Sequence, residues 1–438
     1  MPFLKYSTAF LFVYNLLVSL RVQAIPLYHP YLIFTGIFGL YLVSRIFFDI
    51  LGLVDFGATS QFAFYTFSED VKLRLLINVA IALWALQLGF MLFFKPDRPV
   101  HLKSRRTWER IGLYLFYIGM PFLVYRYVMV GLDVAQLGYS ARISGDLVYR
   151  NTLLVSVMSR LSLAGFFIFL ASVPQTKNFK WHLIIFLAVM SLQLLEGGRY
   201  HTFCLYLTIF SYVFYTRNVK HRLWMYVFLV ASLLFLGAGI GVLRSNSEGL
   251  EAKPLYKFVY EQGFGLQILG HTIEYHDEIT YKPKHLFTHA HYYADLILNR
   301  IVDKEVPTDK MQRMEKYGNL EFCLTYKVNK KAMLGGWDMA VSYMAEAFML
   351  GKEFMVLVLS ALIGLIFFLI GQRHRWQGLS LLFIVMFLPS WIFIPRDSLF
   401  DFITDNISNT FFVLLILITV KFIVHFWPNA LVSRGDKK

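Results

Sequence analysis

Long apolar runs follow one another along almost the whole chain, separated by short polar segments. Several runs approach the roughly 20 residues that a helix needs to cross the hydrocarbon of a bilayer. The pattern predicts about eleven spanning helices, near 6–23, 31–50, 72–94, 111–130, 152–173, 182–196, 200–216, 223–243, 353–371, 379–395 and 407–426. We therefore expect an all-α polytopic membrane protein with about 10–12 transmembrane helices.

Composition supports this class. Of the 438 residues, 57% are hydrophobic and 16% are charged, with a net charge of +14, whereas soluble domains carry about 25% charged residues. The first apolar stretch fits a span least well. It ends in RVQAIPLYHPY and the chain then continues apolar, so we expect a retained helix and not a cleaved signal peptide. The two cysteines, Cys204 and Cys323, predict no disulfide framework.

The orientation follows from lysine and arginine in the short loops. Loop 95–110 has six of these residues, 174–181 has two, 216–222 has three, 372–378 has two and the tail VSRGDKK has three. All five segments fall on one side if the helices alternate as predicted, and that side should be cytoplasmic. The net charge then reflects topology, and we expect no nucleic acid as a partner.

The long segment between the predicted spans 223–243 and 353–371 should lie outside the membrane, on the side opposite to the basic loops. Its 13 acidic and 13 basic residues make it nearly neutral, and stretches 254–275 and 291–304 have apolar residues at helical spacing. We expect short amphipathic helices at the membrane boundary. The chain thus divides into N-terminal transmembrane helices at 1–243 (about eight), a large periplasmic loop at 244–338, and about three C-terminal transmembrane helices at 339–438.

Charged residues collect at the outer ends of the apolar helices. They come from LLEGGRYH, GVLRSN, GLQILGHTIEYHDE, SYMAEAFMLG and IPRDS, and are Glu196, Arg199, Arg244, His271, Glu274, Glu346, Arg396 and Asp397. Charges at this depth are costly and are usually functional. A guanidinium matches phosphate oxygens with two hydrogen bonds, and a carboxylate or imidazole can take a proton from a sugar hydroxyl.

Simpler interpretations stay open for each residue. Glu196 and Arg199 also fit a structural ion pair, and arginines at helix ends such as Arg244 often extend to the interface without a further role. His271 also fits an ordinary interfacial histidine. The histidines of KHLFTHAHYY fit no zinc-binding spacing, so we expect neither a metal nor another cofactor.

The same segments resemble the O-antigen polymerase (Wzy) family of bacterial surface-polysaccharide synthesis. EGGRYHTF is similar to the family's arginine segment that opens a membrane helix. YEQGFGLQILGHTIEY resembles its EQG segment in the large external loop. SYMAEAFMLGKEFMVLVL and IPRDSLFDFI are similar to its glutamate segment and its arginine loop before the last span. FMLG stands where the family usually has an aromatic residue followed directly by glycine.

The resemblance implies a metal-independent, inverting membrane glycosyltransferase with a GT-C-like fold in the inner membrane, active at the periplasmic face. Its donor would be a growing glycan on undecaprenyl pyrophosphate, and its acceptor a single lipid-linked repeat unit. A flippase and a chain-length regulator are the implied partners. For the pyrophosphate we predict Arg199, Arg244 and Arg396; for the base, Glu346 or Glu196, with His271 third; for the acceptor glycan, Glu261, Gln262, Glu274 and Asp397.

Three other functions fit these features less well than a polymerase. An O-antigen ligase uses the same lipid-linked donor and a similar architecture, but the four segments favour the polymerase. A flippase or other transporter would usually show internal repeats and polar residues at mid-membrane; no repeat stands out, and the polar residues lie at the outer edge. An acyltransferase built around a buried histidine fits poorly, because the histidines lie mostly in loops.

Overall fold

The structure is a computed structural model of the chain. It describes residues 1–59, 62–92, 102, 104–138, 148–149, 152–175, 179–196, 200–217, 255–279, 310–335, 337–399 and 401–426. Within these residues the secondary structure is helical apart from one isolated β-bridge between Ala58 and Thr66. The predicted all-α class is therefore confirmed.

The N-terminal part of the chain forms a series of long helices. In chain order these are α1 (Pro2–Leu17), η1 (Val18–Val22), α2 (Pro30–Phe38), η2 (Gly39–Val43), α3 (Ser44–Ile50), α4 (Glu69–Met91), α5 (Arg106–Leu137), α7 (Leu153–Ala171), α8 (Phe179–Ser191), η3 (Leu192–Glu196) and α9 (Tyr200–Arg217). Segments η1 and η2 are π-helical, and η3 is a 3₁₀-helix.

The C-terminal part combines short helices with three long ones. They are α11 (Leu255–Gln262), α12 (Phe264–Glu274), α14 (Lys310–Tyr317), α15 (Leu320–Val328), α16 (Lys330–Leu334), α17 (Tyr343–Gly371), η5 (Arg373–Arg375), α18 (Gly378–Phe393), η6 (Ile394–Arg396) and α19 (Asp401–Phe426). Helix α17 is broken at Gly351 and Lys352, where the backbone leaves the helical region. Its long second part begins where the sequence predicted the span 353–371.

Eight helices within the described residues are long and apolar enough to cross a membrane, and the first of them is Pro2–Val22. They cover eight of the predicted spans, including the uncertain first one. The predicted spans 200–216 and 407–426 lie in helices α9 and α19. The predicted span 223–243 lies outside the described residues. The chain is therefore a multi-pass membrane protein by the length and composition of its helices.

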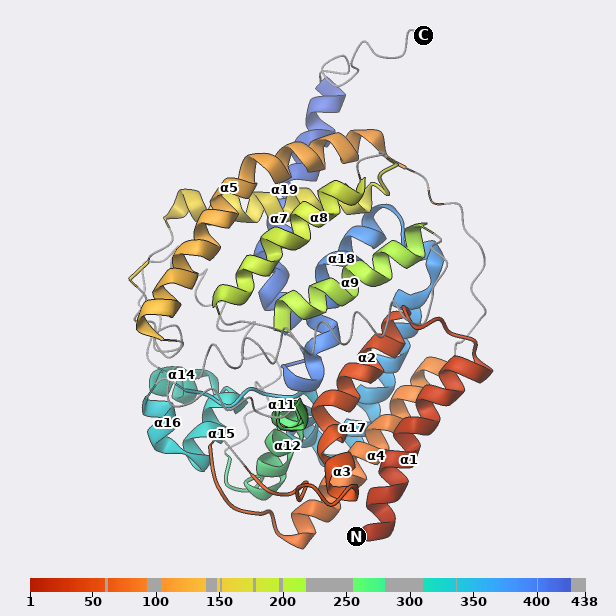
Figure 1. The fold of residues 1–438 in the computed structure, drawn as a ribbon, viewed down its shortest axis with the longest axis vertical. Helices are drawn as coiled ribbons and strands as arrows, with labels where there is room; N and C mark the ends of the chain where they lie inside the picture. The colour runs from red at the N-terminus through yellow and green to blue at the C-terminus, as the bar shows by residue number, and fades with distance from the viewer. Residues whose placement is uncertain are drawn as a thin grey trace.

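The short helices of the predicted large loop gather at one end of the molecule. Figure 1 shows the N-terminus, α3, α12 and the short helices α14–α16 in its lower half, whereas the last turns of α19 lie at the top. A small apolar cluster joins α12, α15 and the start of α17, through residues such as Phe264, Leu324 and Met349. The short helices of the predicted large loop are thus packed onto the helical bundle.

Helices α4 and α17 pack with very close backbones. A Cβ atom added at Gly89 would lie 2.0 Å from the Ala361 carbonyl oxygen, and one added at Gly364 would lie 2.2 Å from the Leu86 carbonyl oxygen. Small residues allow such contact between membrane helices, where dispersion and not the hydrophobic effect drives association. This pair forms the central support for α12, which packs against both helices.

Candidate active site at the EQG turn

The EQG segment forms a tight turn between two helices. Helix α11 ends at Gln262, Gly263 follows, and α12 begins at Phe264. A Cβ atom added at Gly263 would lie 2.6 Å from Cγ of Arg45, and one added at Gly265 would lie 3.0 Å from the Pro395 carbonyl oxygen. The glycines are therefore needed for close approach. They bring the turn against α3 on one side and η6 on the other.

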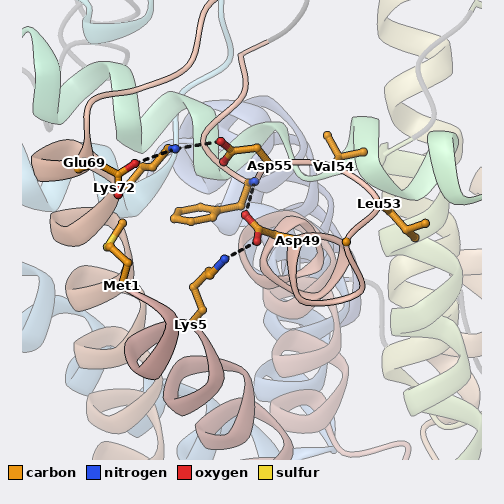
Figure 2. Close-up of a pocket in the computed structure, with 10 residues that line it drawn as sticks. Met1, Lys5, Asp49, Leu53, Val54, Asp55, Glu69 and Lys72 are labelled. Atoms are coloured by element: carbon orange, nitrogen blue, oxygen red, sulfur yellow. Dashed lines mark hydrogen bonds and ion pairs between the residues drawn. The ribbon is translucent and has the colours of Figure 1, made fainter.

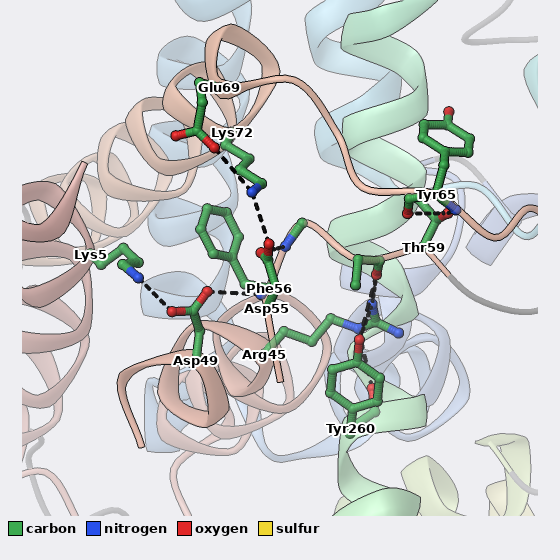
Figure 3. Close-up of polar contacts among 12 residues, drawn as sticks. Lys5, Arg45, Asp49, Asp55, Phe56, Thr59, Tyr65, Glu69, Lys72 and Tyr260 are labelled. Atoms are coloured by element: carbon green, nitrogen blue, oxygen red, sulfur yellow. Dashed lines mark hydrogen bonds and ion pairs between the residues drawn. The ribbon is translucent and has the colours of Figure 1, made fainter. Parts of the chain in front are cut away.

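Arg45 is a fully buried arginine beside this turn, with 0% of its surface exposed. Its Nε donates to the Tyr260 carbonyl oxygen at 3.2 Å, and its Nη1 donates to the Ala58 carbonyl oxygen at 2.9 Å and to the Tyr260 hydroxyl at 3.2 Å. The guanidinium also stacks over the Tyr260 ring at 4.0 Å (Figure 3). The Glu261 carboxylate interacts with it electrostatically.

Arg396 ends η6 on the other side of the turn and is half-buried. Its Nη1 donates to Oε1 of Gln262 at 3.2 Å, and its guanidinium lies 5.5 Å from the centre of the Tyr41 ring. Tyr41 belongs to η2, one turn before Arg45 on the same continuous helix. Two predicted site residues, Gln262 and Arg396, are thus in direct contact, and Tyr41 joins them from a segment that the sequence did not indicate.

Glu346 fixes the chain that follows Arg396. The side chain is 3% exposed and lies in the first turn of α17, which Ser342 caps. One carboxylate oxygen accepts from the Ser398 hydroxyl at 2.7 Å and the other from the Leu399 backbone N–H at 2.9 Å. Asp397, which lies between Arg396 and Ser398 in the chain, is half-buried and accepts from the Ser398 N–H at 3.0 Å. Glu346, Arg396 and Asp397 therefore form one structural unit.

His271 belongs to a separate polar cluster at the far end of α12. Its Nδ1 lies 3.0 Å from the Tyr65 hydroxyl and 3.6 Å from Oε2 of Glu274, and Tyr65 donates to that same oxygen. His271 is 1% exposed and stacks edge-on with Phe67. From Gly263, eight residues of helix at 1.5 Å each place this cluster about 12 Å away along the axis. The structure thus puts His271 and Glu274 together, but apart from Arg396.

The charges of this second cluster follow from burial and hydrogen bonding. Burial lowers the pKa of His271 below its ordinary 6.5, and the Glu274 carboxylate offsets only part of that. Burial alone would raise the pKa of Glu274, but hydrogen bonds from His271 and Tyr65 outweigh it and hold this pKa below 4.5. Burial and the neighbouring Glu274 raise the pKa of Tyr65 well above 10. At neutral pH the cluster therefore holds a neutral histidine and a charged carboxylate.

A family model for the O-antigen polysaccharide polymerase Wzy matches residues 1–425. The chain belongs to this family. No curated protein and no solved structure matches the chain. The resemblance carried by the four short segments is thereby confirmed, and the chain is a polymerising enzyme of the glycosyltransferase type that acts on lipid-linked oligosaccharide repeat units in membranes.

A charged pocket of about 430 Å³ lies beside the candidate site of this polymerase, between the start of α1 and the loop before α4. Figure 2 shows its ion pairs: Lys5 contacts Asp49 at 2.5 Å, and Lys72 contacts Asp55 at 2.8 Å. Asp49 also accepts from the Phe56 N–H at 2.9 Å. Neither Arg396 nor Glu346 lines this pocket. Its ion pairs anchor loop 51–68, which the predicted topology makes the first outer loop and which carries Ala58 and Tyr65.

The remaining predicted residues lie elsewhere. Glu196 is buried at the end of η3, which packs against α5 and α8. Arg199, Arg244 and the histidines of KHLFTHAHYY lie outside the described residues. Asp397 and Cys204 of α9 interact electrostatically, which places α9, the helix that EGGR precedes, close to the Arg396 turn.

Sequence reasoning missed the first outer loop and Arg45. The loop 51–68 looks undistinguished in sequence, yet its Ala58 carbonyl accepts from Arg45 and also from Gln267 of α12, at 2.7 Å. The Phe62 carbonyl accepts from Asn329 at 2.8 Å, which ties the loop to α15 and α16. For Arg45 a signal was present, because an arginine inside the predicted span 31–50 is costly unless it has a role.

Proposed function

We propose that this polymerase transfers a growing glycan from undecaprenyl pyrophosphate onto the non-reducing end of a lipid-linked repeat unit at the periplasmic face. Arg396 is the observation that carries the proposal: a half-buried guanidinium, held by Tyr41 and by Gln262 at the end of α11, a short helix of the predicted large loop. A guanidinium suits a pyrophosphate because it keeps its charge and donates two parallel hydrogen bonds.

In the proposed step, a hydroxyl oxygen of the acceptor sugar attacks the anomeric carbon of the donor sugar. The bond between that carbon and the pyrophosphate oxygen breaks, and undecaprenyl pyrophosphate leaves with the bonding electrons. The hydroxyl proton passes to a base. Negative charge grows on the leaving oxygen, so a cation held in place beforehand lowers the barrier. We assign this role to Arg396, with Arg199 and Arg244 as the further predicted cations.

The carboxylates divide between two tasks in this proposal. Glu346 is buried and accepts from Ser398 and Leu399, so its surroundings favour positioning of the Arg396 turn over proton transfer. Asp397 is half-buried next to Arg396 and suits contact with an acceptor hydroxyl. Glu196 and His271 stay candidates for the base, and Glu261 and Glu274 for glycan binding.

The experiment that tests the proposal is a surface-polysaccharide gel of a strain that lacks this chain. We expect a single-repeat band in place of the polymer ladder, and restoration of the ladder by the wild-type chain but not by Arg396→Ala. Loss of all sugar from the lipid A core would contradict the proposal and point to a ligase or a flippase. The membrane face on which lipid-linked sugar accumulates would then separate these two.

A further inference from the structure

We infer that Arg45 is a positioning residue of the polymerisation site: it holds the Glu261–Gln262–Gly263 turn, which in turn orients Arg396. This inference rests on the proposed function of Arg396. Arg45 is itself fully buried, so it does not meet substrate directly. Its effect would reach the reaction through a short chain of contacts, from Arg45 to the turn, from Gln262 to Arg396, and from Arg396 to the pyrophosphate.

The first step of this chain is the hydrogen bonding of Arg45 to the end of α11. Its hydrogen bonds reach the Tyr260 carbonyl, the Tyr260 hydroxyl and the Ala58 carbonyl. Figure 3 shows the Tyr260 ring beside the Arg45 guanidinium. The planar fork thus joins the last turn of α11 to the first outer loop. A lysine has a single ammonium and no planar fork, so it cannot reproduce the stacking or this set of directions.

The second step is the fit of Gly263 against Arg45. The Arg45 stem lies where a Cβ atom at Gly263 would be, at 2.6 Å from Cγ and 3.0 Å from Cδ. The turn therefore rests on the aliphatic part of Arg45 while the guanidinium holds Tyr260. Arg45 thus contacts the turn by packing and its neighbouring residue by hydrogen bonds, and loss of the stem leaves a gap directly under Gly263.

The third step is the link from the turn to Arg396. Gln262 directly precedes Gly263, and its side-chain oxygen accepts from Arg396 at 3.2 Å. Tyr41 lies under the same guanidinium and belongs to the helix that carries Arg45. The π-helical segment η2 between Gly39 and Val43 supplies Tyr41, and such segments are frequent at functional sites. One helix therefore supports Arg396 both directly and through the turn.

The test combines kinetics with a structural measurement that needs no activity. In membranes supplied with lipid-linked repeat units, we expect Arg45→Lys to lower kcat roughly 10- to 100-fold with KM little changed, since small misplacements of a charge-stabilising group cost that much. Because both residues act in one unit, the double variant with Arg396→Lys should be no slower than Arg396→Lys alone. Amide hydrogen exchange of residues 260–266 should be faster in Arg45→Lys.

A milder variant guards against misfolding. Tyr260→Phe removes only one acceptor of Arg45 and should lower kcat roughly fivefold, the effect of one lost hydrogen bond. Arg74→Lys is the matched control, because the ion pair of this half-exposed arginine with Asp70 lies within α4, outside this network, so kcat and the exchange of 260–266 should be unchanged. Unchanged exchange and kcat in Tyr260→Phe, or additive effects of Arg45→Lys and Arg396→Lys, would overturn the inference. Absence of polymer with the wild-type chain would instead reject the proposed function, and the exchange result would still stand.

Discussion

The role of Glu346 can be decided by two substitutions. In Glu346→Ala, the Ser398 hydroxyl and the Leu399 N–H lose their acceptor. Glu346 itself is only 3% exposed, so water cannot readily replace its carboxylate. Each buried donor left without a partner costs about 1–3 kcal/mol, so the loss should be roughly 2–6 kcal/mol, concentrated in the turn that carries Arg396. We expect polymer synthesis to fall at least roughly 100-fold, because this turn must be held in place.

Glu346→Gln should behave differently. The amide oxygen can accept from the Leu399 N–H, and the amide nitrogen can donate to the Ser398 hydroxyl, which also has acceptor capacity. The turn is then retained at a cost of about 1 kcal/mol, since hydrogen bonds to a charged group are stronger than neutral ones. If Glu346 positions the turn, we expect the glutamine variant to keep most of the wild-type rate, within roughly tenfold.

The assay pairs the polymer ladder on a gel with the initial rate in isolated membranes and the melting temperature in detergent. Glu353→Gln is the control on the same helix, outside these contacts. A glutamine variant that melts like the wild type but is as inactive as the alanine variant would refute the positioning role. It would instead favour Glu346 as the base, one of the two carboxylates that the sequence predicted for this role. Glutamine has the shape of glutamate but cannot take up the proton.

Three further outcomes are expected. Lys352 has φ of 50° and ψ of −142° at the break in α17, a conformation that favours glycine, so Lys352→Gly should raise stability by about 1 kcal/mol, measured as a higher melting temperature. The lowered pKa of His271 gives stability that is present above pH 6.5 and is lost as pH falls below it. His271→Gln should therefore flatten the fall of melting temperature between pH 7 and about 5.5, and an equally steep fall would contradict this. Gly89→Val should lower the melting temperature and reduce folded protein, because its side chain would clash with the Ala361 carbonyl oxygen.

The sequence predicted the helices well because one physical requirement dominates them. A span must be apolar over about 20 residues whatever its neighbours are, so eight spans were found from composition alone. The break at Gly351 and Lys352 was not predicted, although the predicted span begins directly after it, at residue 353, and the helix carrying Glu346 starts at Tyr343. The packing of the large loop onto α17 was not predicted, because its apolar residues gave periodicity but no partner.

The candidate site was predicted in part, and the reason lies in how its residues are held. Arg396 and Gln262 were identified as charged or polar residues at helix ends, yet nothing in a linear pattern says that they meet across 134 positions. Arg45 and Tyr65 were missed because their role exists only through partners far along the chain, at Tyr260 and His271. The EQG turn has a physical explanation only when all these contacts are known.

The order of residues in that turn follows from its three neighbours. Gly263 can only be a glycine because Arg45 occupies the space of a side chain. Gln262 offers a neutral acceptor to Arg396. A carboxylate there would pair with the guanidinium and compete with a pyrophosphate for it. The Glu261 carboxylate interacts electrostatically with Arg45, whose side chain is fully buried. Glutamate beside the buried arginine, glutamine beside the half-buried one and glycine between the helices is therefore the arrangement that the role proposed for Arg396 requires.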